Sequence, residues 1–391
     1  MPVVDIVLIV LLALALIVGI SRGFLATIGS FAGLALGGIA AFWLIPYVGQ
    51  WVTEPAWRGA AIVAAGVLLL LLGAALGAAV GNTLRRGADR IKLRVPERIL
   101  GGIVNLAAAA LALSFFAGTL TTAGVPVVSA ALASSTVVRT IDSLTPDPVR
   151  SALAELRGAV FADGIPRLGQ LIQIGPVPNA PVIALDDPAL TQAAQSVARI
   201  TGTAYACGIT ASGSGFVVAD DRVVTNAHVV AGVDAPLVEL PGQPAKEGRV
   251  IYFDPTDDLA VIAVDGLDAA ALPVVPALAV GSAAVVQGYP YGGPFTSGNA
   301  QVVSEGTVPV PDIYGDQSVP REIYALDAVV RPGNSGGPLL TSTGDVAGVV
   351  FARSETDDNV GYAMTSAELE PVLSQLGSLS APVASGSCTT R

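Results

Sequence analysis

The chain has 391 residues, of which 52% are hydrophobic and only 13% are charged. This length exceeds one ordinary soluble domain, and this apolarity indicates membrane-spanning segments. Residues 1–123 hold 8 Lys and Arg against 4 Asp and Glu, a balance of +4, whereas residues 124–391 hold 12 against 27, a balance of −15. The acidic C-terminal part argues against nucleic acid as a partner, and the two parts are expected in different surroundings.

Four apolar runs open the chain, at residues 3–20, 24–46, 59–82 and 99–120. Each approaches the roughly 20 residues that a helix needs to cross a bilayer. The first run carries Asp5 and lacks both a basic start and a small-residue cleavage site, which argues against a signal peptide. We therefore predict an all-α, four-helix transmembrane domain over residues 1–123, with the lipid bilayer as its partner.

The basic residues of the loops predict the orientation of these helices. Arg22 follows the first run and six Lys and Arg lie between residues 85 and 98, whereas the loop between the second and third runs has only Arg58. The positive-inside rule places the basic loops in the cytoplasm. Both termini, and everything after residue 123, are then expected on the extracytoplasmic side of the cell (inner) membrane.

Glycines recur at every fourth residue in the second and third runs, and small residues on one helix face predict close helix packing. They are Gly29, Gly33 and Gly37, and Gly73, Gly77 and Gly81. A substrate path is the alternative, which the near absence of ionisable residues inside the runs disfavours. In hydropathy and glycine pattern, this half resembles the colicin V production protein family. The resemblance implies anchoring and interaction with other membrane components.

Residues 124–200 are expected to connect the two domains as a partly helical, Pro-rich periplasmic linker. Segments 147–162 and 188–200 have helix-like apolar spacing, and the five prolines of residues 164–188 indicate an extended, mobile stretch between them. An exposed linker beside a tethered protease is a site for self-cleavage, which we keep as a hypothesis.

From residue 201 to 391, short β-branched runs separated by turn residues predict an antiparallel all-β domain, with a closing helix near 366–376. The expected strands lie in SGFVVAD, DRVVTNAHVV, LAVIAVDG, AAVVQGYP, EIYALDAVV, PLLTSTGDVAGVVFAR and GYAMT. About 190 residues suffice for a sizeable core.

Three residues of this region suit nucleophilic catalysis. The only histidine of the chain, His228, lies in TNAHVV, and Ser335 lies in GNSGGP. A serine hydroxyl needs an adjacent imidazole to take its proton and a carboxylate to orient that imidazole. Asp258 directly precedes the apolar run LAVIAV and is preferred for the third role over Asp257, which is expected to face solvent, and over Asp254, which precedes a proline.

The glycines of GNSGGP suggest how a transition state is stabilised. Gly333 lets the backbone turn so that its N–H and that of Ser335 point at one spot, which can hold the negative oxygen of a tetrahedral intermediate. A Gly-rich turn without catalytic function is the alternative for the motif alone. Asn334, inside the motif, and Val329, six residues before Ser335, are the substrate-binding candidates.

The motifs TNAHVV, DLAVI and GNSGGP, in this order, resemble those of chymotrypsin-fold serine proteases, close to the trypsin-like HtrA group. The resemblance covers roughly 203–376 and implies two six-stranded β-barrels with the site between them. It also implies His228 as general base and acid, Asp258 as its orienting partner and Ser335 as nucleophile. Val329 would form the floor of the S1 pocket, which favours apolar or uncharged P1 residues.

No PDZ-like region follows the last expected helix, and the anchor has four helices, unlike HtrA proteases. This combination resembles the MarP-like family of actinobacterial membrane-anchored serine proteases. It implies a periplasmic serine endopeptidase in envelope homeostasis and in acid or oxidative stress resistance. The implied partners are protein substrates in the cell envelope, cell-wall hydrolases among them.

The two cysteines, Cys207 and Cys388, both lie in the part placed outside the cytoplasm, and an oxidising compartment favours a disulfide between them. Two unpaired thiols are the alternative. Cys-x-x-Cys, His pairs and a Walker loop are absent, so we expect neither metal nor cofactor.

Two other classes of function are open to this sequence. One is a membrane scaffold or regulator whose protease-fold domain is latent. The other is a small transporter with a regulatory domain, which the apolar character of the four runs disfavours.

Overall fold

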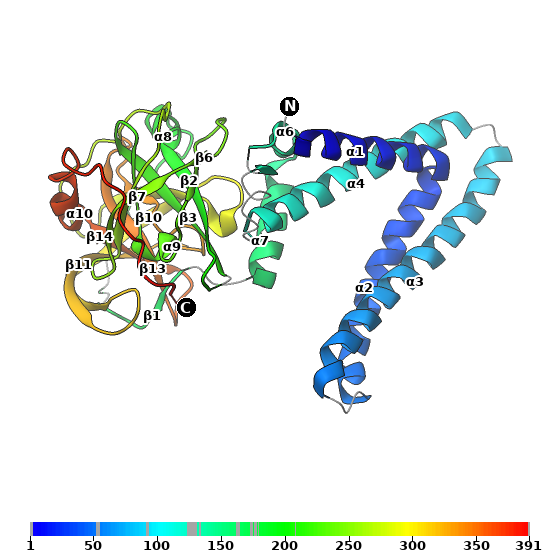
Figure 1. Cartoon of the computed structure of the whole chain (residues 1–391), viewed down its shortest axis with the longest axis horizontal. Coiled ribbons are helices and arrows are strands. Elements are labelled where there is room, and N and C mark those ends of the chain that lie inside the picture. The colour runs from blue at the N-terminus through cyan, green and yellow to red at the C-terminus, as the bar shows by residue number, and fades with distance from the viewer. Residues whose placement is uncertain are drawn as a thin grey trace. The chain divides into compact units, whose positions relative to one another are not determined.

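The computed structural model describes residues 3–389, except 52–54, 91–93, 123–130, 133, 162–164, 173–174, 176–177, 179 and 208. The chain divides into two compact units, Met1–Ser114 and Phe115–Arg391. The expected domain boundary at residues 123 and 124 lies outside the described residues. We describe each unit by itself (Figure 1).

Four long helices dominate the N-terminal region (blue to cyan in Figure 1): α1 (Val3–Arg22), α2 (Phe24–Trp51), α3 (Pro55–Arg90) and α4 (Arg94–Thr122). Among the described residues, these four helices have the length and apolarity to cross a membrane. The four predicted apolar runs are therefore confirmed as helices.

The glycine faces of α2 and α3 lie against each other. A Cβ atom added to Gly33 would come within 2.0 Å of the carbonyl oxygen of Gly73, and one added to Gly77 within 1.9 Å of that of Gly29. Side chains cannot be accommodated at such distances, so the two backbones touch because the glycines have none. This confirms the predicted helix packing.

The basic turns of the first unit meet at one end of the helices. Arg85, near the end of α3, donates hydrogen bonds to the carbonyl oxygens of Ser21 (3.1 Å) and Arg22. Its Nε also lies 3.4 Å from Glu97 Oε2 in the first turn of α4. The Arg22 turn, the last part of α3 and the first turn of α4 therefore lie together, which agrees with the orientation argument.

The second unit contains two seven-stranded sheets. The first has the order β6-β5-β2-β3-β4-β8-β7. Its strands are β2 (Val197–Ala204), β3 (Ile209–Ala219), β4 (Arg222–Thr225), β5 (Leu237–Glu239), β6 (Lys246–Glu247), β7 (Arg249–Asp254) and β8 (Leu259–Ala263). A short helix, α9 (Ala227–Val230), follows β4.

The second sheet has the order β1-β13-β12-β9-β10-β11-β14, and it closes on itself because β13 also pairs with β14. Its strands are β1 (Arg167–Leu168), β9 (Ala283–Gly288), β10 (Thr296–Pro311), β11 (Ser318–Asp327), β12 (Pro338–Leu340), β13 (Val346–Ser354) and β14 (Val360–Thr365). Six strands form the closed part, and β1 is added from the connector. The predicted all-β domain is confirmed, and α10 (Ser366–Leu373) is the expected closing helix.

Residues 124–200, the expected linker, are called the connector below. Their described elements before β2 are α6 (Thr136–Leu144), α7 (Asp147–Phe161), β1 and α8 (Pro188–Ala194). Described parts of its proline-rich stretch lie on the second sheet: Gln301 Nε2 donates to the Pro178 carbonyl (2.6 Å), and Ile183 N donates to Asn299 Oδ1 (2.9 Å). The stretch that the prolines mark is thus attached to the second sheet at these points.

Three local expectations were wrong. The helix expected over 188–200 ends at Ala194, and residues 197–200 belong to β2, because a short apolar run suits a buried strand as well as a helix. Residues 227–230 form α9 rather than part of a strand. Cys207 precedes SGFVVAD, the first strand expected from the sequence, but in the structure β2 comes before it and Cys207 lies between β2 and β3.

Candidate active site

His228 in α9 and Asp258 just before β8 form a buried pair beside the first sheet. The Nδ1 atom of His228 lies 2.8 Å from Asp258 Oδ2 and 3.0 Å from Oδ1. Oδ1 also accepts a hydrogen bond from the His228 backbone N–H at 2.9 Å. A carboxylate at Nδ1 favours the tautomer that carries its proton there, which leaves the Nε2 lone pair available.

Adjacent strand ends bring these two residues together. Strands β4 and β8 pair with Thr225 opposite Ala260, so the residues just after β4 lie beside those just before β8. Asn226 reinforces this arrangement, because its side-chain amide donates to the Asp258 carbonyl at 2.9 Å. Asp258 itself has φ of +57°, an uncommon conformation for a residue with a side chain.

Of the three candidate acids, only Asp258 hydrogen-bonds His228 among the described residues. Asp254 Oδ1 instead accepts the backbone N–H groups of Thr256 (2.8 Å) and Asp257 (3.1 Å), which shapes the turn before β8. Burial, and then the charge of Asp254, raises the pKa of Asp257 above its usual range. Asp257 is half-buried, not solvent-facing as expected.

Ser335 lies in the turn between β11 and β12 and is fully buried. Its carbonyl accepts from Ser214 N at 2.8 Å. The next residue, Gly336, has φ of +81°, and a Cβ there would come within 2.2 Å of the Ser214 carbonyl and 3.0 Å of Asn226 N. Gly336 thus lets the serine turn pack against the segment that leads into His228.

His228 Nε2 and Ser335 Oγ are both buried without a hydrogen-bond partner. Orphaned buried polar atoms are rare and call for an explanation. The free lone pair of the imidazole is what the serine hydroxyl needs, and catalytic hydrogen bonds are often long until substrate binds. The two atoms are therefore candidates for a proton transfer between them.

The carbonyl groups of Pro332 and Gly333 are both held by hydrogen bonds from residues outside the turn. The Pro332 carbonyl accepts from Tyr291 N at 2.5 Å. The Gly333 carbonyl accepts from Ser214 Oγ at 2.7 Å, and that oxygen in turn accepts from Tyr289 N at 2.9 Å. These contacts fix the backbone on both sides of Gly333, which has φ of +95°.

The N–H groups of Gly333 and Ser335 have no hydrogen-bond partner within the described part of the chain. Two free donors on this turn are what an oxyanion hole requires. The sequence did not reveal that Ser214 and Tyr291 hold this turn. The only clue to Tyr291 is structural, its φ of +56°, which a motif does not disclose.

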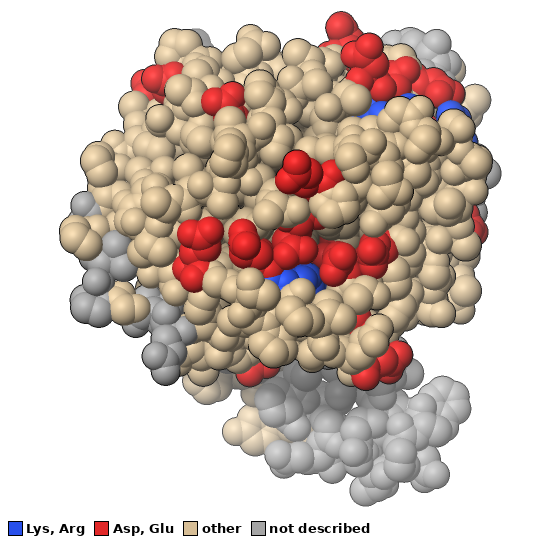
Figure 2. Space-filling model, turned by 90° about the vertical axis from the view of Figure 1, so that its left-hand side faces the viewer, with Lys and Arg blue, Asp and Glu red and all other residues tan. Residues whose placement is uncertain are grey.

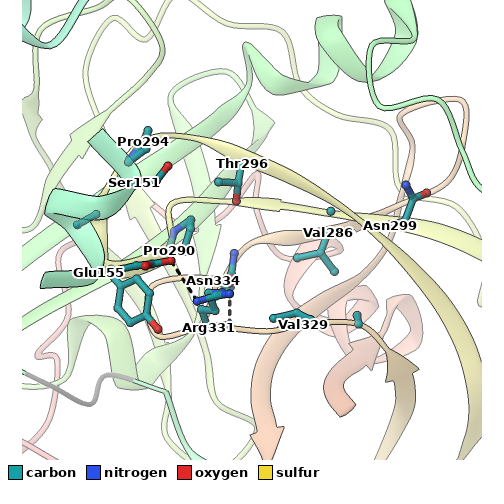
Figure 3. Close-up of a pocket in the computed structure, with 14 residues that line it drawn as sticks. Ser151, Glu155, Val286, Pro290, Pro294, Thr296, Asn299, Val329, Arg331 and Asn334 are labelled. Carbon is teal, nitrogen blue, oxygen red and sulfur yellow. Dashed lines mark hydrogen bonds and ion pairs between the residues drawn. The ribbon is translucent and has the colours of Figure 1, made fainter. Parts of the chain in front are cut away.

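A pocket of about 410 Å³ lies beside this turn (Figure 3). Asn334 lines it and accepts the Arg331 N–H through Oδ1 at 2.9 Å. Val329 also lines it but is 54% exposed, whereas Val330 is 1% exposed in the core of the closed sheet. Helix α7 forms the opposite wall, where Glu155 points toward Arg331 at 3.4 Å.

The two cysteines are joined in a disulfide, with Cα atoms 6.5 Å apart and a sequence separation of 181. The tail that carries Cys388 lies against the chain that follows α9. Gly232 N donates to the Ser385 carbonyl at 2.9 Å, and Ser385 Oγ donates to the Val233 carbonyl at 2.8 Å. The bridge therefore braces the side of the domain that carries His228.

The surface of the second unit is rich in acidic groups, which form a band on the face shown in Figure 2. The buried guanidinium of Arg321 lies among several carboxyl groups and 5.7 Å from the Phe351 ring centroid. Burial lowers its pKa, against the opposing attraction of Asp258 and Asp257. Burial likewise raises the pKa of Glu368.

Within the described residues, no three His, Cys, Asp or Glu side chains cluster as metal ligands would. The structure joins His228 to Asp258 by hydrogen bonds and packs the turn that follows Ser335 against the segment that leads into His228.

Each half of the chain matches a known protein family. Residues 213–349 match the trypsin-like peptidase domain family, and residues 4–146 match the colicin V production protein family. The chain is 31% identical over 397 residues to the serine protease Rv3671c of Mycobacterium tuberculosis (strain ATCC 25618 / H37Rv), which covers 99% of this chain and 98% of that protein.

Two further matches concern the C-terminal region. A probable periplasmic serine endoprotease DegP-like of Pseudomonas fluorescens is 34% identical over 165 residues, or 39% of this chain and 32% of that protein. The crystal structure of the active form of the Rv3671c protease from M. tuberculosis superposes with a TM-score of 0.51 and 35% identity. It covers 56% of this chain and 100% of that one.

Proposed function

The chain belongs to the family of the serine protease Rv3671c, and from this premise we propose that this serine endopeptidase works through His228, Asp258 and Ser335, outside the cytoplasm. The observation that carries the proposal is the buried His228–Asp258 pair, whose Nε2 is left without a partner while the Ser335 hydroxyl also has none.

The reaction then runs in two halves. His228 Nε2 takes the proton of Ser335 Oγ, which attacks the peptide carbonyl, and the Gly333 and Ser335 N–H groups bind the resulting oxyanion. The imidazolium, held by Asp258, gives its proton to the leaving amine, and an acyl-enzyme remains. Water, deprotonated by the same Nε2, then attacks the ester, and Ser335 recovers its proton as the acid departs.

We further propose that residues 1–123 anchor the enzyme in the cell membrane, that residues 124–200 connect, and that residues 201–391 form the protease domain on the extracytoplasmic side. The four apolar helices and the basic turns that meet at one end support this arrangement. So does the likeness to a protease described as periplasmic. Envelope proteins, with cell-wall hydrolases among them, are the proposed substrates, and acid or oxidative stress is the proposed setting.

The linker at residues 164–188 is proposed as a site of self-cleavage. Its prolines limit regular structure, and part of it is exposed, with Val182 as an example. N-terminal sequencing of any fragment released by the active enzyme, and not by Ser335→Ala, tests this. An intact chain in active preparations contradicts it.

Peptide cleavage by the full-length protein in detergent tests the catalytic proposal. We expect the wild type and Ser374→Ala, a substitution of an exposed serine after α10, to cleave a quenched peptide equally. Ser335→Ala is expected to be inactive. A scaffold with a latent protease fold is the alternative, and it predicts that none of the three cleaves, at any pH or redox state.

A further inference from the structure

Strand β13 links the serine turn to an edge of the closed sheet. Gly336 N donates to the Val350 carbonyl at 2.8 Å, and Val350 N donates to the Gly337 carbonyl at 2.9 Å. Before Val350 this edge of β13 pairs with β12, and the opposite edge pairs with β14 as far as Arg353. Gly336 and Gly337, the two residues that follow Ser335, therefore pair with β13 at Val350. The residues of β13 after Val350 form the next part of the same edge.

The connector occupies this edge. Strand β1 pairs with β13 in parallel, with Arg167 opposite Arg353 and Leu168 opposite Ser354. Arg353 N donates to the Pro166 carbonyl at 3.1 Å. Because Arg353 already pairs with β14 on its other side, β1 must lie on the edge that leads from the serine turn.

Two aliphatic side chains of this segment are buried in the protease domain. Ile165 is 5% exposed and belongs to the core cluster of the closed sheet, together with Ala328, Val330 and Val350. Leu168 is 7% exposed and joins the neighbouring cluster. The segment thus combines main-chain pairing at a sheet edge with side chains in pockets.

We propose that residues 165–168, the connector strand, occupy the substrate-binding edge of the protease and inhibit it from within the chain. Peptides commonly bind by adding a strand to an exposed sheet edge, with affinity from main-chain hydrogen bonds and specificity from side-chain pockets. One edge holds one strand, so a substrate must displace the connector strand. This inference rests on the proposed function of Ser335.

The occupant also defines the substrate class. The buried cluster that holds Ile165 consists mostly of alanine, valine and leucine side chains, so a substrate segment that takes the place of the strand is expected to bring an aliphatic side chain to this cluster. Ala328 and Val330, rather than the half-exposed Val329, are the residues of the 328–331 segment that belong to the same buried cluster.

Weakening the connector strand should make the enzyme more active. A segment of the chain that competes with substrate leaves kcat unchanged. It multiplies the apparent KM by the reciprocal of the fraction of molecules in which the connector strand is displaced, the open state. Loss of a buried isoleucine side chain favours the open state by roughly tenfold. We expect Ile165→Ser to lower KM for an aliphatic quenched peptide by up to about tenfold.

The test compares full-length wild type, Ile165→Ser and Val182→Ser in detergent. Val182 belongs to the same linker but is 83% exposed, so its substitution is the matched control. Each protein is measured for kcat and KM, for the rate of fluorophosphonate labelling of Ser335, and for thermal unfolding. The proposal predicts a lower KM and faster labelling for Ile165→Ser alone.

An unchanged or higher KM in folded Ile165→Ser overturns the proposal, as does an equal gain in Val182→Ser. If Ile165→Ser does not fold, Leu168→Ser takes its place with the same two readings. Equal labelling and equal cleavage by all three proteins would support the protease function and contradict only the inhibitory role of the connector strand. Absence of labelling in the wild type and in the variants would contradict both the proposed function of Ser335 and the inhibitory role of the connector strand.

Discussion

The two sheets of the second unit contribute to the site in different ways. The first sheet supplies His228 and Asp258 from paired strand ends, and their hydrogen bonds lie within that sheet and its own turns. The second supplies Ser335 on a turn whose shape depends on partners outside it, such as Ser214 of β3. The proposed base is thus positioned by its own sheet, whereas the proposed nucleophile and oxyanion hole are held by contacts from other segments.

Removing the chemistry itself should have the largest effect. Ser335→Ala is expected to lower kcat by about 10⁶-fold, whereas Asp258→Asn, which retains the shape but disturbs the imidazole tautomer, should cost about 10⁴-fold. Steady-state kinetics on one peptide measures both. Equal activity of Asp257→Asn and Asp258→Asn would show that the wrong carboxylate has been assigned.

The disulfide tests how far the bracing of the first sheet matters. Cys207→Ser/Cys388→Ser should lower the free energy of unfolding by at most about 5 kcal/mol, because the bridge closes a loop of this size. Denaturant unfolding of the oxidised and double-variant proteins measures the loss. No change in stability would mean that the hydrogen bonds of the Ser385 tail alone secure the segment after α9.

Ser214→Ala tests the dependence of the second sheet on the first. The substitution frees the Gly333 carbonyl and should lower kcat by up to about 100-fold, the effect of weakening one oxyanion donor, with little change in KM. Ser212→Ala is the control, because its buried hydroxyl has no hydrogen-bond partner. Equal kinetics for the two variants would contradict a positioning role for Ser214.

The acidic groups of α10 should give a smaller, pH-dependent effect. Burial raises the pKa of Glu368, so the folded state binds this proton more tightly than the unfolded state, and its destabilising effect is present at neutral pH and lost in acid. Glu368→Gln keeps the oxygen that accepts from Glu322 N and should raise Tm at pH 7. The difference in Tm between this variant and the wild type should vanish as the pH falls through the ordinary pKa range of a glutamic acid. Glu370→Gln, a substitution of an exposed residue on the same helix, is the control. A Tm difference between Glu368→Gln and the wild type that widens in acid would contradict the expected direction of the effect.

Much of this architecture could be predicted because its causes are local. Length and apolarity predict the four helices, four-residue glycine spacing predicts the contact of α2 and α3, and three short motifs single out His228, Asp258 and Ser335. The cysteine pair followed from its expected compartment.

The remaining features depend on tertiary context. Two residues, Arg167 and Leu168, are too few to identify a strand, and β1 exists only because the edge of β13 accepts it. Ser214 and Tyr291 act through backbone atoms of a distant turn, which no spacing reveals. Val329 was placed at a pocket floor by resemblance, but exposure distinguishes it from Val330 only in the folded chain.

The most direct measurement is to locate the fluorophosphonate adduct by mass spectrometry of the full-length protein and to compare its rate of formation with that in His228→Gln. We expect the adduct on Ser335 of the wild type, and its near absence in His228→Gln, because the chain has no second imidazole to take the proton. An adduct on another serine, or an undiminished rate in His228→Gln, would contradict a hydroxyl activated by this histidine.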